Sequence, residues 1–89
     1  MEVNGKVVVV TGGASGIGKS LCERFTREGA RAVIVSDINQ EGIDATVADI
    51  ADKTEALGIR SDVGNEADVN DLVATTLKRF GQIDLFCII

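Results

Sequence analysis

Apolar and polar positions along this chain alternate between a spacing typical of strands and one typical of helices. Runs rich in β-branched residues at 6–10 and 31–36, a short run at 56–60 and a last apolar run from residue 83 onward predict strands. Between these runs, apolar residues recur every three or four positions, which predicts amphipathic helices. Strands alternating with helices predict an α/β fold with a parallel sheet and right-handed crossovers.

Residues that begin and end helices stand at the borders of the three helical patterns. The first helix is expected over residues 15–28 and stops at Gly29, while Asn39 and Asn65 are expected to cap the next two and Gly81 to end the third. The apolar stripes expected to be buried are, in chain order, Ile17, Leu21, Cys22 and Phe25; Ile43, Val47, Ile50 and Thr54; and Val69, Leu72, Val73, Leu77 and Phe80.

A glycine-rich turn joins the first strand to the first helix. Residues 11–18 read Thr-Gly-Gly-Ala-Ser-Gly-Ile-Gly and follow four consecutive valines. The first N–H groups of a helix have no partner inside the helix, so they can bind a phosphate. Glycines at Gly12, Gly16 and Gly18 let the chain turn sharply and let a pyrophosphate approach the backbone. This segment therefore predicts a nucleotide site.

The same residues also match a P-loop, the phosphate-binding loop of many nucleotide hydrolases. Residues 13–20, from Gly13 to Ser20, fit the G-x-x-x-x-G-K-[ST] pattern. In that interpretation Lys19 would reach the terminal phosphates and Ser20 would bind Mg²⁺. Position by position, the glycine turn alone does not separate a P-loop from a dinucleotide site.

Asp37, which ends the second strand, distinguishes the two interpretations. It lies about 20 residues beyond Gly18, where dinucleotide folds place the acidic residue that accepts hydrogen bonds from the adenosine ribose. An aspartate after a strand is more often a helix cap or a turn residue when nothing else supports it. Its register with the glycine turn favours ribose binding here.

Asp62 and Val63 follow the third strand at the same predicted edge of the sheet. In open α/β sheets, ligands bind beyond the carboxyl ends of the strands. Asp62 could accept a hydrogen bond from an adenine amino group while Val63 supplies an apolar contact. The alternative is a turn residue followed by a core residue, and these two residues alone do not decide between them.

Composition limits the class of protein. The chain has 89 residues, enough for one small domain, and its 45% hydrophobic content is ordinary for a globular protein. A net charge of −5 argues against nucleic-acid binding. No apolar run is long enough for a membrane span, and no signal peptide precedes the first strand. Cys22 and Cys87 are isolated and fit reduced core thiols in a cytoplasmic protein.

Taken together, these motifs resemble the first part of a short-chain dehydrogenase/reductase. The family's T-G-x-x-x-G-x-G pattern matches residues 11–18, its strand-two acid matches Asp37, and its Asp-Val pair matches Asp62 and Val63. Residues 80–85, Phe-Gly-Gln-Ile-Asp-Leu, match the approach to its fourth strand. The likeness covers essentially the whole chain, and because the motifs occur together in order it leaves the P-loop as a poor second interpretation.

The resemblance implies a Rossmann-type doubly wound parallel sheet in which the strands follow the order 3-2-1-4 with three helices. It implies that backbone amides near Ser15, Ile17 and Gly18 hold a pyrophosphate and that Ile38 lies along the adenine. The cofactor expected is NAD rather than NADP, because Asp37 would accept the 2′-hydroxyl and repel a 2′-phosphate. The positions where NADP-binding members usually carry a basic residue are Ser15 and Ile38, both uncharged.

The chain departs from the family pattern at its last residues. Ile88 and Ile89 stand where the family continues Asn-Asn-Ala-Gly, and the sequence has no Tyr to serve as the family's catalytic acid/base residue. We therefore expect residues 1–89 to form a truncated, incomplete dinucleotide-binding portion that does not catalyse hydride transfer alone. The apolar edge of the fourth strand would then invite self-association. Alternatives to the oxidoreductase are a non-catalytic NAD-binding or dimerising module and a P-loop hydrolase.

Overall fold

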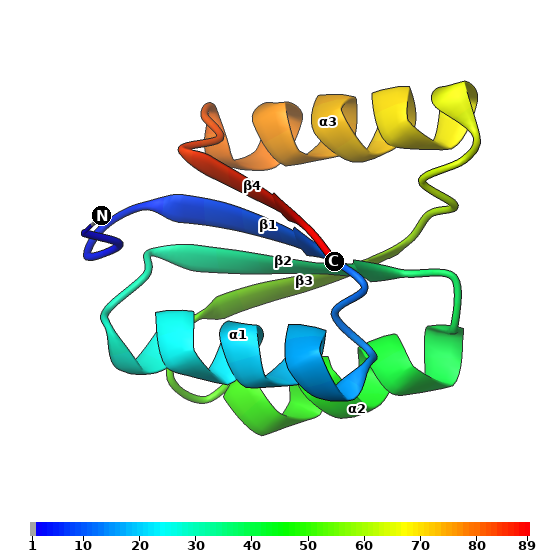
Figure 1. The fold of residues 1–89 in the computed structure, drawn as a ribbon. Helices are drawn as coiled ribbons and strands as arrows, with labels where there is room; N and C mark the ends of the chain where they lie inside the picture. Colours follow the sequence, from blue (N-terminus) through cyan, green and yellow to red (C-terminus); the bar gives the residue numbers. More distant parts are fainter. Residues whose placement is uncertain (1) are drawn as a thin grey trace.

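A four-stranded parallel sheet with helices on both faces forms the molecule (Figure 1). The computed structural model describes residues 2–89. The elements are β1 (Val7–Thr11), α1 (Gly16–Arg27), β2 (Ala32–Asp37), α2 (Gln40–Ile50), β3 (Glu55–Arg60), α3 (Glu66–Phe80) and β4 (Leu85–Ile88). The strand order β3-β2-β1-β4 confirms the predicted topology, and each predicted element is present. The ends lie within two residues of those expected, except that α2 stops at Ile50 and does not reach Thr54.

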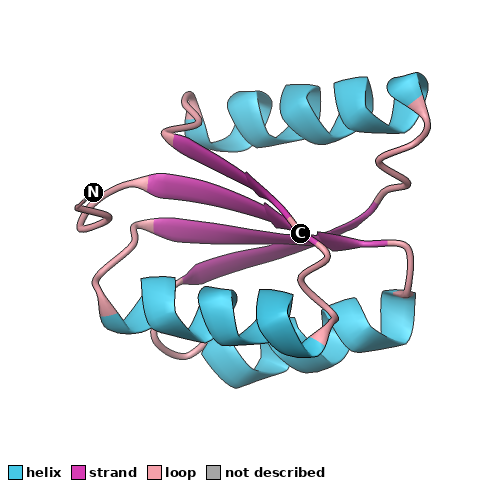
Figure 2. Cartoon of the chain, in the orientation of Figure 1, coloured by secondary structure: helices cyan, strands magenta, loops and turns pink. Residues whose placement is uncertain are grey.

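The sheet separates two cores. Figure 2 shows α1 and α2 on one face and α3 on the other. Successive strand residues point to opposite faces, so β1 supplies Val8 and Val10 to the α1–α2 side and Val7 and Val9 to the α3 side. All four valines are completely buried because β2 and β4 flank β1 within the sheet. β1 is therefore the centre of both cores.

Side-chain caps set the beginnings of the helices. Ser15, Asn39 and Asn65 accept hydrogen bonds from backbone N–H groups in the first turns of α1, α2 and α3. Gly29 and Gly81 adopt positive φ angles of 87° and 78° just beyond α1 and α3. The predicted stops are confirmed at both glycines, where other residues would be strained.

Three expected core positions are wrong. Thr54 lies beyond α2, in the turn before β3, and donates its hydroxyl to the Ala30 carbonyl at 2.8 Å. Ile17 is 69% exposed because it lies in the first turn of α1, at the edge of the sheet. Leu77 is 43% exposed because α3 meets the sheet through a narrow stripe of residues four apart, Leu72, Thr76 and Phe80. Within residues 2–89, no helix is both long and apolar enough to cross a membrane.

Asp84 attaches the start of β4 to the start of β1. Its carboxylate accepts hydrogen bonds from the Val7 backbone N–H at 2.8 Å and from the Gln82 side chain at 2.7 Å. Its own N–H donates to the Val7 carbonyl at 2.9 Å. The bond from Val7, then that from Gln82, and nearby basic charges lower the pKa of Asp84 below its usual value of 3.8.

This lowered pKa predicts an acid-sensitive contribution to stability. A carboxyl group whose pKa falls on folding stabilises the protein above its unfolded-state pKa, and the contribution disappears as pH drops through the folded-state value. Asp84→Asn should therefore lower the thermal midpoint at pH 7 more than at pH 3. Thermal unfolding followed by circular dichroism at both pH values measures this. An equal drop at both values would contradict the assignment.

Candidate functional site

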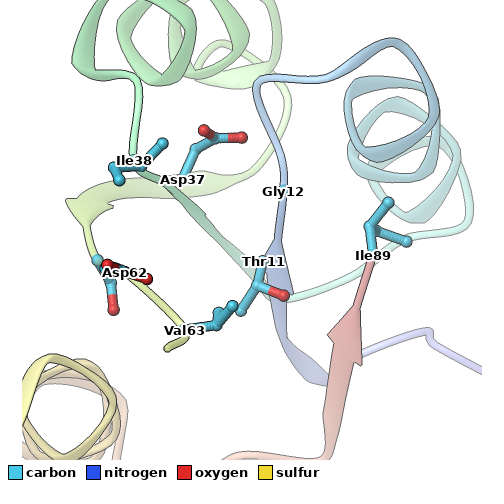
Figure 3. Close-up of a pocket in the computed structure, with 8 residues that line it drawn as sticks. Thr11, Gly12, Asp37, Ile38, Asp62, Val63 and Ile89 are labelled. Atoms are coloured by element: carbon cyan, nitrogen blue, oxygen red, sulfur yellow. The ribbon is translucent and has the colours of Figure 1, made fainter. Parts of the chain in front are cut away.

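The carboxyl ends of the strands surround a cavity of about 180 Å³. Figure 3 shows Ile38, Asp62 and Val63 on one side of the cavity and Gly12 and Ile89 on the other. The cavity is lined by Thr11, Gly12, Asp37, Ile38, Ser61, Asp62, Val63 and Ile89. Residues from the ends of β1, β2, β3 and β4 thus meet at one place, as expected for a parallel sheet.

The glycine turn is ordered by its own hydrogen bonds. The Ser15 hydroxyl donates to the Gly12 carbonyl at 2.7 Å and accepts from the Gly18 N–H at 3.1 Å. The Ser15 N–H also donates to the Gly12 carbonyl, at 3.0 Å. Ser15 is therefore both the N-cap of α1 and the brace of the turn.

These bonds leave free only part of the helix N-terminus. Of the amides expected near a pyrophosphate, those of Ser15 and Gly18 are bonded inside the turn. Over residues 2–89, the N–H groups of Gly16 and Ile17 have no acceptor recorded. Unpaired N–H groups in the first turn of a helix, together with the helix dipole, form an anion site.

Gly18 and Gly16 differ in whether the packing of the chain requires a glycine. A Cβ at Gly18 would lie 1.9 Å from the Gly12 carbonyl oxygen, so the packing of α1 on the turn requires glycine there. A Cβ at Gly16 would meet nothing within 4 Å. The chain's own packing therefore does not account for glycine at position 16.

Asp37 connects the end of β2 to the glycine turn. One carboxylate oxygen accepts from the Ala14 N–H at 3.0 Å, and the other accepts from the Asn39 N–H at 3.0 Å. A carboxylate has about four lone-pair sites. Asp37 can therefore accept further hydrogen bonds at the cavity it lines while still holding the turn.

An apolar pair and a carboxylate form the remainder of the rim. Ile38 and Val63 are 56% and 53% exposed, although both are large and apolar. Exposed apolar side chains that face a cavity can pack against an apolar part of a ligand, such as a flat aromatic ring. Asp62 accepts from the Gly64 N–H at 2.8 Å through one oxygen, and its own N–H is bonded to the Asp68 side chain at 3.0 Å.

Three residues that line the cavity were not predicted as site residues. Thr11 donates its hydroxyl to the Cys87 carbonyl at 3.2 Å. Ile89 packs closely on Gly12, because a Cβ on that glycine would lie 3.0 Å from the Cβ of Ile89. The Ser61 hydroxyl is buried without a hydrogen-bond partner. Thr11 is the first residue of the glycine motif and Ser61 directly precedes the Asp-Val pair, whereas nothing in the sequence pattern of Ile89 indicates a site.

Lys19, the lysine of the P-loop pattern, forms an ion pair with α2. Its ammonium group pairs with the Asp49 carboxylate at 2.8 Å. Asp49 belongs to the last turns of α2, whereas the other end of that helix lies beside the glycine turn. The hydrogen bond and charge of Asp49 raise the pKa of Lys19.

Residues 2–89 hold two thiols and no cluster of metal-ligating side chains. Cys22 and Cys87 are free thiols. Burial, followed by the proximity of Cys87, raises the pKa of Cys22 to about 12, so its thiol remains protonated at neutral pH.

The fold is an α/β fold with a cavity at the carboxyl ends of its parallel strands, and comparisons with known proteins give its family. The model of the short chain dehydrogenase family matches residues 6–88. Sorbitol dehydrogenase of Cereibacter sphaeroides is 42% identical over 85 residues, which are 96% of this chain and 32% of that protein. The chain belongs to the short-chain dehydrogenase family.

Solved structures agree with this assignment. A short-chain dehydrogenase/reductase from Burkholderia phymatum in complex with NAD superposes with a TM-score of 0.90 at 33% identity, covering 97% of this chain and 31% of that one. The 3-ketoacyl-(acyl-carrier-protein) reductase from Brucella melitensis, complexed with NADH, gives 0.86 at 34% identity, covering 94% and 33%. The chain spans about a third of the length of these relatives.

The close approach at Gly18 predicts a large loss of stability on substitution. Gly18→Ala should lower the free energy of unfolding by about 3 kcal/mol or more, because its Cβ meets backbone that cannot move aside. Gly16→Ala is the matched control and should change it by less than about 1 kcal/mol. Urea unfolding of both variants measures the difference, and similar stabilities would contradict this account of the turn.

Proposed function

We propose that this chain binds NAD(H) along the carboxyl edge of its sheet and is the cofactor-binding portion of an oxidoreductase. One observation carries the proposal: Asp37 lines the cavity and accepts a hydrogen bond from the Ala14 N–H, two residues before the first of the free amides at the start of α1. An anion site next to a hydrogen-bond acceptor suits a pyrophosphate joined to a ribose.

Each site residue has a role in this proposal. The amides of Gly16 and Ile17 bind the pyrophosphate, with Ser15 holding the turn and Gly12, Gly16 and Gly18 allowing the close approach. Asp37 accepts the ribose hydroxyls. Ile38 and Val63 cover the two sides of the adenine, and the free oxygen of Asp62 accepts from its amino group. The glycine turn can accommodate the phosphates because nothing lies within 4 Å of the position that a Cβ on Gly16 would take.

Charge supports NAD over NADP. The carboxylate of Asp37 would repel a 2′-phosphate, and the nearby side chains of Ser15 and Ile38 carry no positive charge that could bind one. Lys19, the nearest lysine in the helix that follows the turn, is paired with Asp49. Both solved structures described above hold NAD or NADH, which supports the same preference.

Hydride transfer between an alcohol and a ketone is proposed for the complete protein. NAD supplies the hydride acceptor when it is bound. The residues of this chain bind and orient the dinucleotide, and we expect no catalysis from residues 1–89 alone because they include no tyrosine and no histidine. Free thiols at Cys22 and Cys87 support a cytoplasmic location within this proposal.

Asp37→Ala tests the ribose assignment and the cofactor preference together. The variant should bind NAD about tenfold to a hundredfold more weakly, because charge-assisted hydrogen bonds to the ribose are lost. Affinity for NADP should change much less, since a repulsion is removed at the same time. Titration calorimetry with both dinucleotides measures this, and unchanged NAD affinity would refute the ribose assignment.

Gly16→Ala separates binding from folding. The added methyl group would point into the open space beside the glycine turn, where the pyrophosphate is proposed to bind. NAD affinity should therefore fall while stability is retained. Asp62→Asn keeps an acceptor oxygen near the proposed adenine position, so it should weaken NAD binding less than Gly16→Ala does. If Gly16→Ala bound NAD with wild-type affinity, the proposal that the pyrophosphate binds at this turn would be wrong.

We also propose that copies of the chain associate through β4. This strand pairs with β1 along one edge only, and Ile88 and Ile89 are 70% and 50% exposed. Unpaired apolar edges favour pairing with another strand. Sedimentation should show a species larger than 9.3 kDa that shifts toward this mass in Ile88→Lys. A monomeric wild type at high concentration would refute the association.

A further inference from the structure

Three threonines are buried within helices, and one of them makes an unusual hydrogen bond. Thr26 and Thr76 donate their hydroxyls to carbonyls four residues earlier in their own helices, Cys22 at 2.7 Å and Leu72 at 2.8 Å. This local bond is the ordinary one for a threonine inside a helix. Thr46 of α2 instead donates to the Gly13 carbonyl at 3.0 Å, in the glycine turn.

The contact at Thr46 is fully enclosed. Thr46 is 1% exposed, so its hydroxyl and the Gly13 carbonyl bond each other and not water. Loss of the hydroxyl would leave that carbonyl buried without this partner, which is costly. The bond therefore ties the turn to α2, a helix that does not precede or follow it directly in the chain.

A second contact brings the same two segments together one helical turn earlier. A Cβ at Gly42 would lie 2.4 Å from the Cβ of Ala14. Only glycine lets the start of α2 approach the turn this closely. Gly42 also donates its N–H to the cap residue Asn39 at 3.2 Å, so its position is fixed by the beginning of the helix.

The turn is held from β2 as well. The Gly13 N–H donates to the Ser36 carbonyl at 2.9 Å, and the Ala14 N–H donates to Asp37 at 3.0 Å. β2 thus accepts hydrogen bonds from the N–H groups of Gly13 and Ala14. On the other side, α2 donates a hydrogen bond to the Gly13 carbonyl and packs against the Ala14 methyl group. Ser15 and Gly16 follow immediately, so this clamp determines where the free amides point.

We propose that Thr46 is a positioning residue for dinucleotide binding, acting through the glycine turn with Gly42 as its packing partner. The inference rests on the proposed NAD site, since it assigns to α2 the task of presenting the Gly16 and Ile17 amides. Thr46 touches no ligand in this account. Its effect is selective for the diphosphate part of a ligand, because adenine and ribose are bound by residues at the end of β2 and just after β2 and β3.

Amide exchange in the ligand-free chain tests the clamp directly. Thr46→Val removes the hydroxyl at nearly constant volume, and Thr46→Ser keeps it. We expect the Ala14 N–H to exchange about threefold to tenfold faster in Thr46→Val and at the wild-type rate in Thr46→Ser. Thr76→Val is the matched control on α3 and should leave Ala14 unchanged. Equal acceleration in Thr46→Val and Thr76→Val, or none in either, would overturn the proposal.

Binding of two probes tests the consequence. Thr46→Val should weaken NAD about threefold to tenfold and adenosine, which lacks phosphates, by less than about twofold. Equal weakening of both, or of neither, would overturn the positioning role. If wild type binds neither probe, the proposed NAD site fails, while amide exchange still decides the clamp. Should Thr46→Val not fold, Gly42→Ala serves in its place: it keeps the hydroxyl but pushes on Ala14, and the same selective loss of NAD is expected.

Discussion

The contact between Gly18 and Gly12 is the constraint on which the sheet edge depends. The backbone of α1 passes so near the end of β1 that no side chain fits between them. This approach allows a helix to begin a few residues after a buried strand and to direct its first amides past the edge of the sheet. The position of the cavity, the register of Ser15 as a cap and the arrangement of α1 over β1 all follow from it.

Part of the hydrogen-bonding capacity of the turn is used to maintain its own shape. Ser15 and Gly18 bond within the turn, and Asp37 fixes Ala14 before any ligand is considered. The site is therefore preorganised, and a ligand would meet two free amides in place of a flexible loop. The same carboxylate belongs to both the turn and the cavity, so a change at Asp37 affects two parts of the site at once.

The sequence predicted the fold well because its signals are local and agree with one another. Runs of valine and isoleucine, asparagine caps and terminal glycines each specify an element, and their order specifies the topology. Ile17 and Leu77 show the limit, since helical spacing indicates a face but not how much of it a neighbour covers. Among the residues that line the cavity, Asp37 could be predicted from its spacing to the glycine turn and Asp62 from its place after the third strand. The bond from Thr46 to Gly13 could not, because it joins segments distant in sequence and threonine is common in helices.

The attachment of β4 at Asp84 has a consequence for motion. The strand is held at its start by bonds to Val7 in both directions, whereas its end carries Ile89 against Gly12. The far end is restrained as well, by the bond from the Thr11 hydroxyl to the Cys87 carbonyl. Acid that protonates Asp84 would therefore loosen β4 at the amino ends of the strands, at the edge of the sheet away from the cavity.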